Sequence, residues 1–208
     1  MRVRIKICGM TRPGDAAIAA QLGVDAIGLV FHAGSPRCVS VEQARELTAQ
    51  LPAFVTVTAL FLDPDPEQVR DVLRGTRVDH LQFHGDESPE FCRSFGRPYV
   101  KAAPMGGPLD IAAYARQYAE AAALLLDSHT AGQKGGTGRS FDWCSLPHLD
   151  APPLILAGGL TADNVAAAIR VVHPYGVDVS SGVEREPGIK DAEKMAAFVH
   201  EVNHVTLA

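Results

Sequence analysis

Two residues able to move protons, Cys8 and Asp127, each close a short apolar run of the sequence. A cysteine there is often only a small buried hydrophobe, but a cation such as Lys6 nearby would lower its pKa from about 8.5 and favour a thiolate base. A carboxyl ending the run Ala-Leu-Leu-Leu is poorly placed for a surface role, and partial desolvation would raise its pKa and favour the proton-donating form. The two residues therefore indicate acid–base chemistry.

Two glycine-bearing turns follow the last two apolar runs, one at Gly158 and Gly159 and the other at Ser181 and Gly182. Glycine lets backbone N–H groups approach an anion, and a helix N-terminus adds partial positive charge. One such turn is equally well explained by a sharp change of chain direction. Two turns after consecutive final strands favour a phosphate-binding site.

Three further residues have both a binding and a structural interpretation. The planar fork of Arg37 fits a substrate carboxylate, although a solvated surface charge explains it equally well. His84 is either a site residue or a hydrogen-bonded structural histidine. Asp178 is either a ligand for a sugar hydroxyl or a partner of Lys6 or Lys101 inside the fold.

Short β-branched or apolar runs alternate with helical segments along the chain, in eight pairs, as expected of parallel strands with helical crossovers. Pro13 and Pro66 are placed to open helices, and Thr161 or Asp163 can cap another. The strands that we predict are 2–8, 26–31, 54–61, 80–84, 99–103, 122–127, 154–158 and 177–181.

Eight such units in 208 residues, 47% of them apolar, leave little length for long edge connections or a second domain. We therefore predict an α/β fold, a single parallel eight-stranded (β/α)8 TIM barrel over residues 1–208. Alternation along the first strand puts Ile5 and Ile7 on one face, and Arg4, Lys6 and Cys8 on the other, which must then face inward.

All strands of a parallel barrel deliver their C-terminal residues to one rim, where the active sites of such barrels lie. Cys8, His84, Asp127 and Ser181 end four of the predicted strands. We therefore expect these residues to surround one cavity, with the Gly-rich loop from Ser128 to about Ser140 nearby.

Composition excludes several other classes of protein. The formal charge of −5 is mild, and no lysine or arginine stripe could neutralise a nucleic acid. The four cysteines form no close pair, which argues against a disulfide framework or a compact zinc site. No apolar run approaches the roughly 20 residues of a membrane span, and no secretion signal is seen. We expect free thiols and a cytoplasmic location.

Taken in order, several motifs resemble phosphoribosylanthranilate isomerase over nearly the whole chain. Each is weak alone, but the ordered set is highly specific. Departures are Cys38, where the family commonly has an aromatic residue, and a more polar third strand. The matching segments are 6–12, 35–37, 82–85, 126–128, 135–138, 141–143, 156–160 and 179–184.

The resemblance implies an aldose–ketose isomerase that performs an Amadori rearrangement in tryptophan biosynthesis. It makes Cys8 the general base and Asp127 the general acid, with Arg37 on the anthranilate carboxylate and the last two turns on phosphate. It implies no metal and no cofactor, because the iminium intermediate itself acidifies the proton to be removed. We therefore expect a phosphorylated small molecule as the partner, and a protein that is a monomer or a homodimer.

Two other interpretations share the phosphate turns. A histidine-pathway aminoaldose isomerase would be expected to carry an aspartate where this chain has Cys8, and a relative of thiamine-phosphate synthase would want metal-binding carboxylates that we do not find. A non-catalytic phosphometabolite-binding module would need neither Cys8 nor Asp127.

Overall fold

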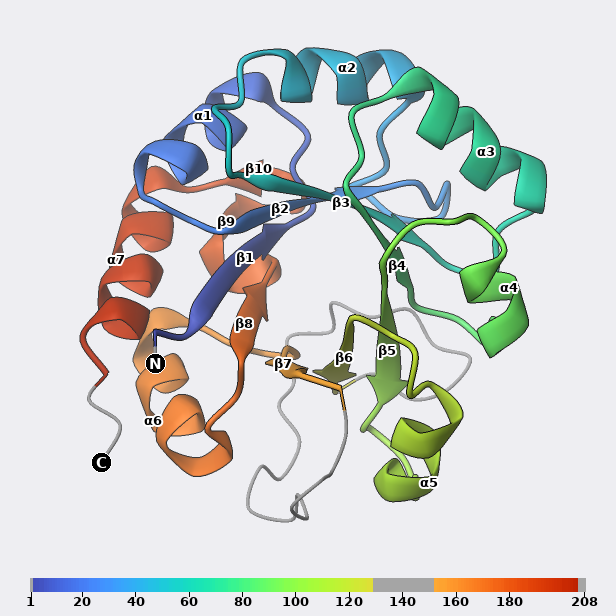
Figure 1. Cartoon of the computed structure of the whole chain (residues 1–208). Helices are drawn as coiled ribbons and strands as arrows, with labels where there is room; N and C mark the ends of the chain where they lie inside the picture. Colours follow the sequence, from blue (N-terminus) through green and yellow to red (C-terminus); the bar gives the residue numbers. More distant parts are fainter. Residues whose placement is uncertain (1, 129–151, 206–208) are drawn as a thin grey trace.

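Eight parallel strands form the centre of the structure, a computed structural model that describes residues 2–128 and 152–205. Neighbours in sequence pair with one another, and β8 pairs with β1, so the sheet closes into the barrel seen in Figure 1. The predicted fold class is thus confirmed. The strands are β1 (Arg4–Cys8), β2 (Ala26–Val30), β3 (Thr56–Phe61), β4 (His80–Phe83), β5 (Tyr99–Pro104), β6 (Ala123–Asp127), β7 (Leu154–Leu156) and β8 (Gly176–Val179).

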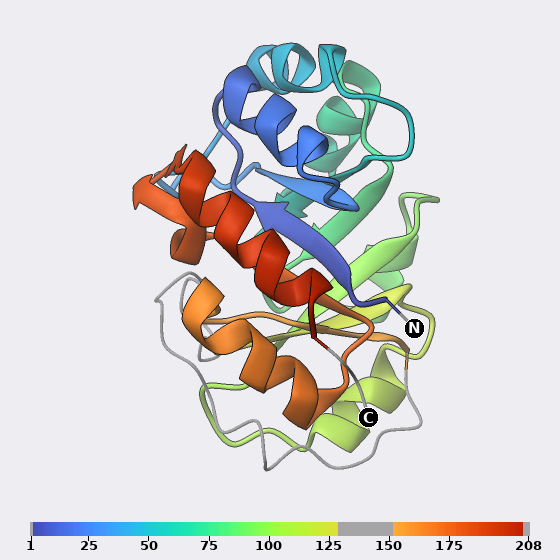
Figure 2. The same cartoon turned by 90° about the vertical axis from the view of Figure 1, so that its left-hand side faces the viewer.

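Helices surround the strands on the outside, with α7 between α1 and α6 (Figures 1 and 2). Pro13 and Pro66 open α1 and α3 as predicted, because the missing N–H of proline costs nothing in a first turn. Thr161 is the N-cap residue of α6. The described helices are α1 (Pro13–Gln21), α2 (Val41–Ala49), α3 (Pro66–Gly75), α4 (Pro89–Arg93), α5 (Ile111–Gln117), α6 (Ala162–Val172) and α7 (Ala192–Asn203).

The sixth of the eight predicted strand–helix pairs cannot be followed completely, because residues 129–151, between β6 and β7, lie outside the described residues. Most of the Gly-rich loop, the motifs at 135–138 and 141–143, and Cys144 belong to that segment. Cys8, Cys38 and Cys92 are free thiols, as expected.

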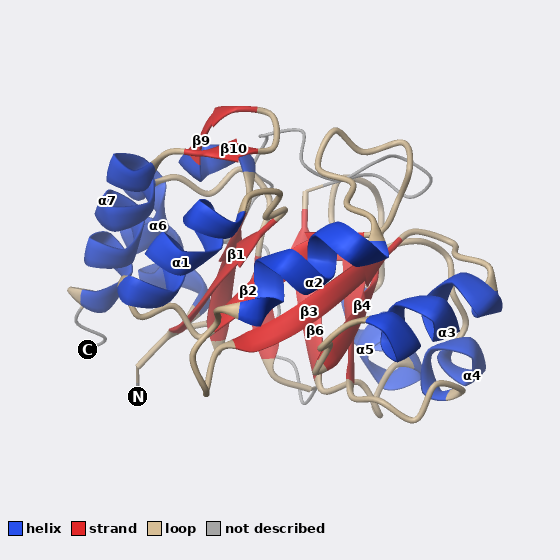
Figure 3. Ribbon diagram, turned by 90° about the horizontal axis from the view of Figure 1, so that it is seen from above, coloured by secondary structure: helices blue, strands red, loops and turns tan. Residues whose placement is uncertain are grey.

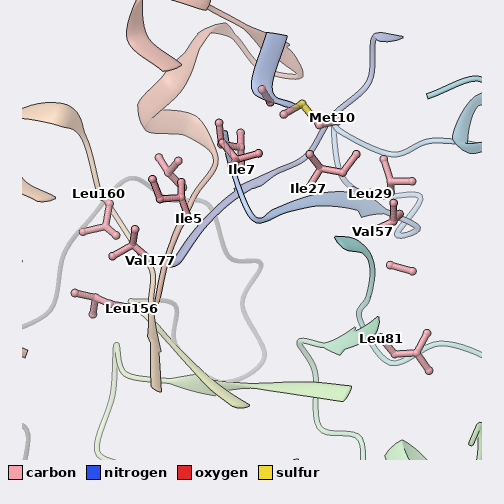
Figure 4. Close-up of a cluster of buried hydrophobic side chains, with 14 of the residues drawn as sticks. Ile5, Ile7, Met10, Ile27, Leu29, Val57, Leu81, Leu156, Leu160 and Val177 are labelled. Carbon is pink, nitrogen blue, oxygen red and sulfur yellow. The ribbon is translucent and has the colours of Figure 1, made fainter. Parts of the chain in front are cut away.

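Apolar side chains pack in two regions, one on each side of the sheet. Ile5 and Ile7 are fully buried between the sheet and its helices, in the cluster of Figure 4. Leu125 packs inside the barrel with small side chains of the neighbouring strands, so Asp127, two residues on, points inward as well. The alternation along β1 was therefore predicted correctly for Lys6 and Cys8, which are buried. Arg4, the first residue of the strand, is exposed.

A short antiparallel hairpin, β9 (Glu184–Glu186) with β10 (Ile189–Lys190), was not predicted. Strand β8 ends at Val179, two residues before the end of the predicted strand. A 3-10 turn, η2 (Ser181–Val183), follows it and leads into the hairpin. Figure 3 shows the hairpin at the end of the barrel opposite the N-terminus. It therefore lies at the rim where the strands end.

Candidate active site

The thiol of Cys8 lies at the upper end of β1, above the ion pair of Lys6 and Asp178. Parallel pairing of β1 and β8 places those two residues side by side, and Lys6 Nζ donates to Asp178 Oδ2 at 2.8 Å. Both side chains are buried. Asp178 thus pairs with Lys6 and not with Lys101, whose Nζ instead lies 3.0 Å from Glu87 Oε2. The second carboxyl oxygen of Asp178 has no hydrogen-bond partner among the described residues.

The pKa of Cys8 moves in the direction opposite to our expectation. Burial raises it, and the positive charges of Lys6 and Lys190 only partly oppose that effect, because Asp178 raises the pKa further. The prediction of a lowered pKa was wrong because it counted the cation but not the loss of water around a thiol that is only 6% exposed. Cys8 is therefore a protonated thiol in the free protein at neutral pH.

Asp127 ends β6 and contacts His84, which directly follows β4. The Nε2 atom of His84 lies 3.0 Å from Asp127 Oδ2, and Gln82 Nε2 lies 3.2 Å from the other ring nitrogen. Ser128 Oγ donates to Asp127 Oδ1 at 3.4 Å. These contacts hold the carboxyl in a defined orientation inside the barrel. Gln82 was not among the predicted site residues, although it begins the matching segment 82–85 and lies two residues before His84 on the same strand face.

Arg37 is not a solvated surface charge, since its side chain is only 13% exposed. Its Nε donates to Glu184 Oε1 at 2.8 Å and its Nη2 to Glu184 Oε2 at 2.7 Å. One edge of the fork expected to hold a ligand is thus occupied by a carboxylate of the protein. Glu184 and Lys190, which contacts it, lie in the unpredicted hairpin and were missed. The only sequence signal was that Glu184 closes the last matching motif.

The two glycine turns have the backbone geometry that glycine permits. Gly158 and Gly159 have φ of 81° and 68°, in the left-handed region, and this explains why β7 ends earlier than predicted. A Cβ on Gly182 would lie 1.9 Å from the carbonyl oxygen of Leu160, so the second turn packs directly on the first. The backbone N–H groups of Gly158 and Gly159 donate to no other described residue.

One pocket brings the predicted residues together. Its open space, with the solvent-filled mouth included, is about 920 Å³. The residues predicted for the site that line it are Cys8, Arg37, His84, Asp127, Gly158, Gly159, Asp178, Ser181 and Gly182.

Two other features are absent from the part of the chain that the structure describes. No group of three or more His, Cys, Asp or Glu side chains within 2–128 and 152–205 is arranged to hold a metal ion. Within the same ranges, no helix has the length and apolar character that crossing a membrane requires.

A closed barrel with a thiol, a carboxyl and paired glycine turns at one rim belongs to the class of (β/α)8-barrel enzymes that act on phosphorylated small molecules. The family model "N-(5'phosphoribosyl)anthranilate (PRA) isomerase" matches residues 5–201. The chain belongs to this family, and it is an isomerase of tryptophan biosynthesis.

Curated relatives and solved structures of the family cover almost the whole chain. The N-(5'-phosphoribosyl)anthranilate isomerase of Halorhodospira halophila is 54% identical over 202 residues, 97% of each chain. The phosphoribosyl anthranilate isomerase structure from Thermotoga maritima is 39% identical with a TM-score of 0.88, and covers 96% of this chain and 98% of its own.

A further solved structure of the family is a complex with a ligand. It is a phosphoribosyl anthranilate isomerase in complex with reduced 1-(o-carboxyphenylamino)-1-deoxyribulose 5-phosphate, 37% identical with a TM-score of 0.85, and it covers 96% of this chain and 98% of its own.

Proposed function

We propose that this chain converts N-(5'-phosphoribosyl)anthranilate to 1-(2-carboxyphenylamino)-1-deoxyribulose 5-phosphate, with Cys8 as general base and Asp127 as general acid. The observation that carries the proposal is that one pocket is lined by a thiol, a carboxyl and two glycine turns. The family membership and the product analogue bound by the solved relative support this substrate. They also favour it over the histidine-pathway and binding-module alternatives.

Two proton transfers divide the reaction. Asp127 gives its proton to the ribose ring oxygen as the C1'–O bond breaks, and the nitrogen lone pair forms the C1'=N bond of an iminium. The thiolate of Cys8 then removes the C2' proton, and the electrons of that C–H bond form the C1'=C2' bond of a neutral enolamine. Loss of the C2' hydroxyl proton and protonation of C1' give the aminoketone.

Cys8 must lose a proton before it can act as the base. Burial raises the pKa of Cys8, so the thiol holds its proton in the free site and must release it to solvent before the C2' proton is removed. The positive charge that develops on the iminium lies next to the sulfur in this mechanism and stabilises the thiolate when the base is needed. Lys6 and Lys190 act on the sulfur in the same direction.

Binding contacts follow from the shape of the pocket. The N–H groups of the turns at Gly158 and Ser181, with the N-terminus of α6, are suited to the phosphate. Arg37 is suited to the anthranilate carboxylate. The unpartnered oxygen of Asp178 can accept a hydrogen bond from a ribose hydroxyl, and His84 orients Asp127 and borders the same space.

The organisation of the protein around this site is part of the proposal. We expect residues 1–208 to form one barrel domain, active as a monomer or a homodimer in the cytoplasm, with no cofactor and no nucleic-acid partner. Sedimentation of the purified protein and fractionation of cells test the assembly and the location.

The decisive experiment mixes purified protein with freshly made phosphoribosylanthranilate and follows the loss of anthranilate fluorescence. We expect loss that scales with protein concentration and disappears in the Cys8→Ala/Asp127→Asn double variant. Unchanged fluorescence, in a protein whose melting temperature still rises with added sugar phosphate, would establish a binding module instead and overturn the proposal.

A further inference from the structure

The contact between Arg37 and Glu184 restricts which part of the guanidinium can meet a ligand. Nε and one hydrogen of Nη2 are used by the two carboxylate oxygens. A guanidinium is rigid and planar, with five N–H donors, so the edge that remains for a second carboxylate is that of Nη1 and Nη2. Glu184 therefore determines the direction in which Arg37 offers its second pair of donors.

Glu184 is itself held from several sides. Its Oε1 accepts from Lys190 Nζ at 2.9 Å and from the backbone N–H of Gly188 at 3.3 Å, and its carbonyl accepts from Lys194 Nζ at 2.8 Å. The side chain is only 5% exposed. A carboxylate fixed in this way is a rigid support, not a mobile surface group that happens to meet an arginine.

The hairpin that carries Glu184 is anchored to the rest of the rim. The backbone N–H of Lys190 donates to Asp15 in α1 at 3.1 Å, and Thr11 donates to the carbonyl of Gly188. A Cβ on Gly188 would come within 3.1 Å of the Pro36 carbonyl oxygen, so the hairpin turn packs against the loop that holds Arg37. The hairpin that carries Glu184 and the loop that carries Arg37 thus pack against each other.

The side chains of Arg37, Lys190 and Glu184 together carry a net positive charge. Arg37 and Lys190 contribute two positive charges and Glu184 one negative charge, a net charge of +1 beside the pocket. Burial alone would raise the pKa of Glu184, but the hydrogen bond from Arg37 and the charge of Lys190 outweigh it and lower the pKa. The carboxyl is thus ionised at neutral pH, and the cluster offers one positive charge to one incoming carboxylate.

We propose that Glu184 is a positioning residue that aims the free edge of Arg37 at the carboxylate on the aromatic ring of the substrate. This inference rests on the proposed carboxylate-binding role of Arg37. Glu184 touches neither the reacting atoms nor the ligand, and acts through Arg37 alone. Without it the pocket still binds the phosphate end of the substrate, but it no longer distinguishes a ring with a carboxylate from a ring without one.

The test uses two inhibitors that differ only at the ring, reduced 1-(o-carboxyphenylamino)-1-deoxyribulose 5-phosphate and the same compound without its carboxylate. The ratio of their inhibition constants measures the contribution of the carboxylate. It is determined for the wild-type protein, Arg37→Ala, Glu184→Gln and Glu184→Asp. Glu186→Gln is the matched control, because Glu186 is an exposed acid on the same strand. Thermal melting checks that every variant is folded.

In the wild type we expect the compound with the carboxylate to bind roughly 10- to 100-fold more tightly, as is usual for a charged hydrogen-bonded contact. The ratio should fall to about one in Arg37→Ala and approach one in Glu184→Gln. Glu184→Asp, which keeps the charge but shortens the reach, should give a ratio between those of the wild type and Glu184→Gln. Glu186→Gln should keep the wild-type ratio. The KM of the substrate should rise in Glu184→Gln while kcat changes little.

A wild-type ratio in Glu184→Gln overturns the inference, even when both inhibitors bind more weakly, because equal losses indicate a structural role. An unchanged ratio in Arg37→Ala overturns instead the proposed role of Arg37. If Glu184→Gln does not fold, Glu184→Asp decides the question, since a ratio equal to that of the wild type would again reject positioning.

Discussion

His84 and Asp127 share a hydrogen bond within the pocket, with 3.0 Å between Nε2 and Oδ2 and with both side chains 8% exposed. The amide nitrogen of Gln82 can only donate, so Nδ1 of the same ring is the acceptor in that contact, and the hydrogen on Nε2 points toward Asp127. The other carboxylate oxygen, Oδ1, accepts a hydrogen bond from Ser128 Oγ at 3.4 Å. The two contacts together orient the carboxyl that we propose as the general acid.

Replacement of Asp127 by asparagine should lower kcat by about 10²–10⁴ while leaving the fold intact, because an amide of the same shape cannot donate an acidic proton. Steady-state fluorescence assays measure the loss. Asp71→Asn, an exposed acid on α3, is the control and should keep wild-type turnover. Normal activity in Asp127→Asn would rule out Asp127 as the acid.

Replacement of Cys8 by alanine should reduce kcat by a similar factor, about 10²–10⁴, since the C2' proton loses its acceptor. Cys38→Ala serves as the matched control, because that exposed thiol lies beside Arg37 in sequence but does not line the pocket. The same assay compares the two variants. Equal activities would remove the thiol from the mechanism.

The titration of Cys8 can be measured directly. Burial raises its pKa, so thiolate should be scarce at neutral pH and increase only as the pH passes the ordinary thiol value of about 8.5. The measurement is the thiolate absorbance of the wild type minus that of Cys8→Ser, followed against pH in the absence of substrate. A difference signal already complete at pH 7 would show the opposite shift.

The buried ion pair of Lys6 and Asp178 should matter for stability. Lys6→Met leaves an unpaired buried carboxylate and should cost about 3–5 kcal/mol of unfolding free energy, whereas Lys6→Met/Asp178→Leu should cost clearly less. Denaturant unfolding compares them with Arg70→Met, which breaks an exposed pair and should cost at most about 1 kcal/mol. If the double variant were less stable than Lys6→Met, the unpaired carboxylate of Asp178 would not be the cause of the loss.

The glycine turns should be sensitive to a single methyl group. Gly182→Ala places a Cβ against the Leu160 carbonyl, so the turns must separate, and the KM should rise about tenfold or more if they bind phosphate. Gly14→Ala in α1 meets no atom within 4 Å and should leave KM unchanged. Inorganic phosphate should raise the melting temperature of the wild type and of Gly14→Ala more than that of Gly182→Ala. An equal rise in melting temperature in the wild type and both variants would show that phosphate binds elsewhere.

Most of the barrel was predictable because its signals are local. Alternation along β1 and the position of Asp127 after three leucines are properties of short segments, and parallel strands necessarily deliver Cys8, His84 and Asp127 to one rim. The hairpin β9–β10 was missed because its two short strands are stabilised by contacts with Thr11 and Asp15, far away in the sequence.

By itself the sequence determined the fold class, the family and many of the residues of the pocket, because strand periodicity and motif order can be read along the chain. Only the tertiary structure decided the pKa of Cys8 and the contacts that hold Arg37. It showed that burial outweighs Lys6 in raising the pKa of Cys8, and that Arg37 is held by Glu184. Both depend on desolvation and on contacts between residues far apart in sequence, and these exist only once the barrel has closed.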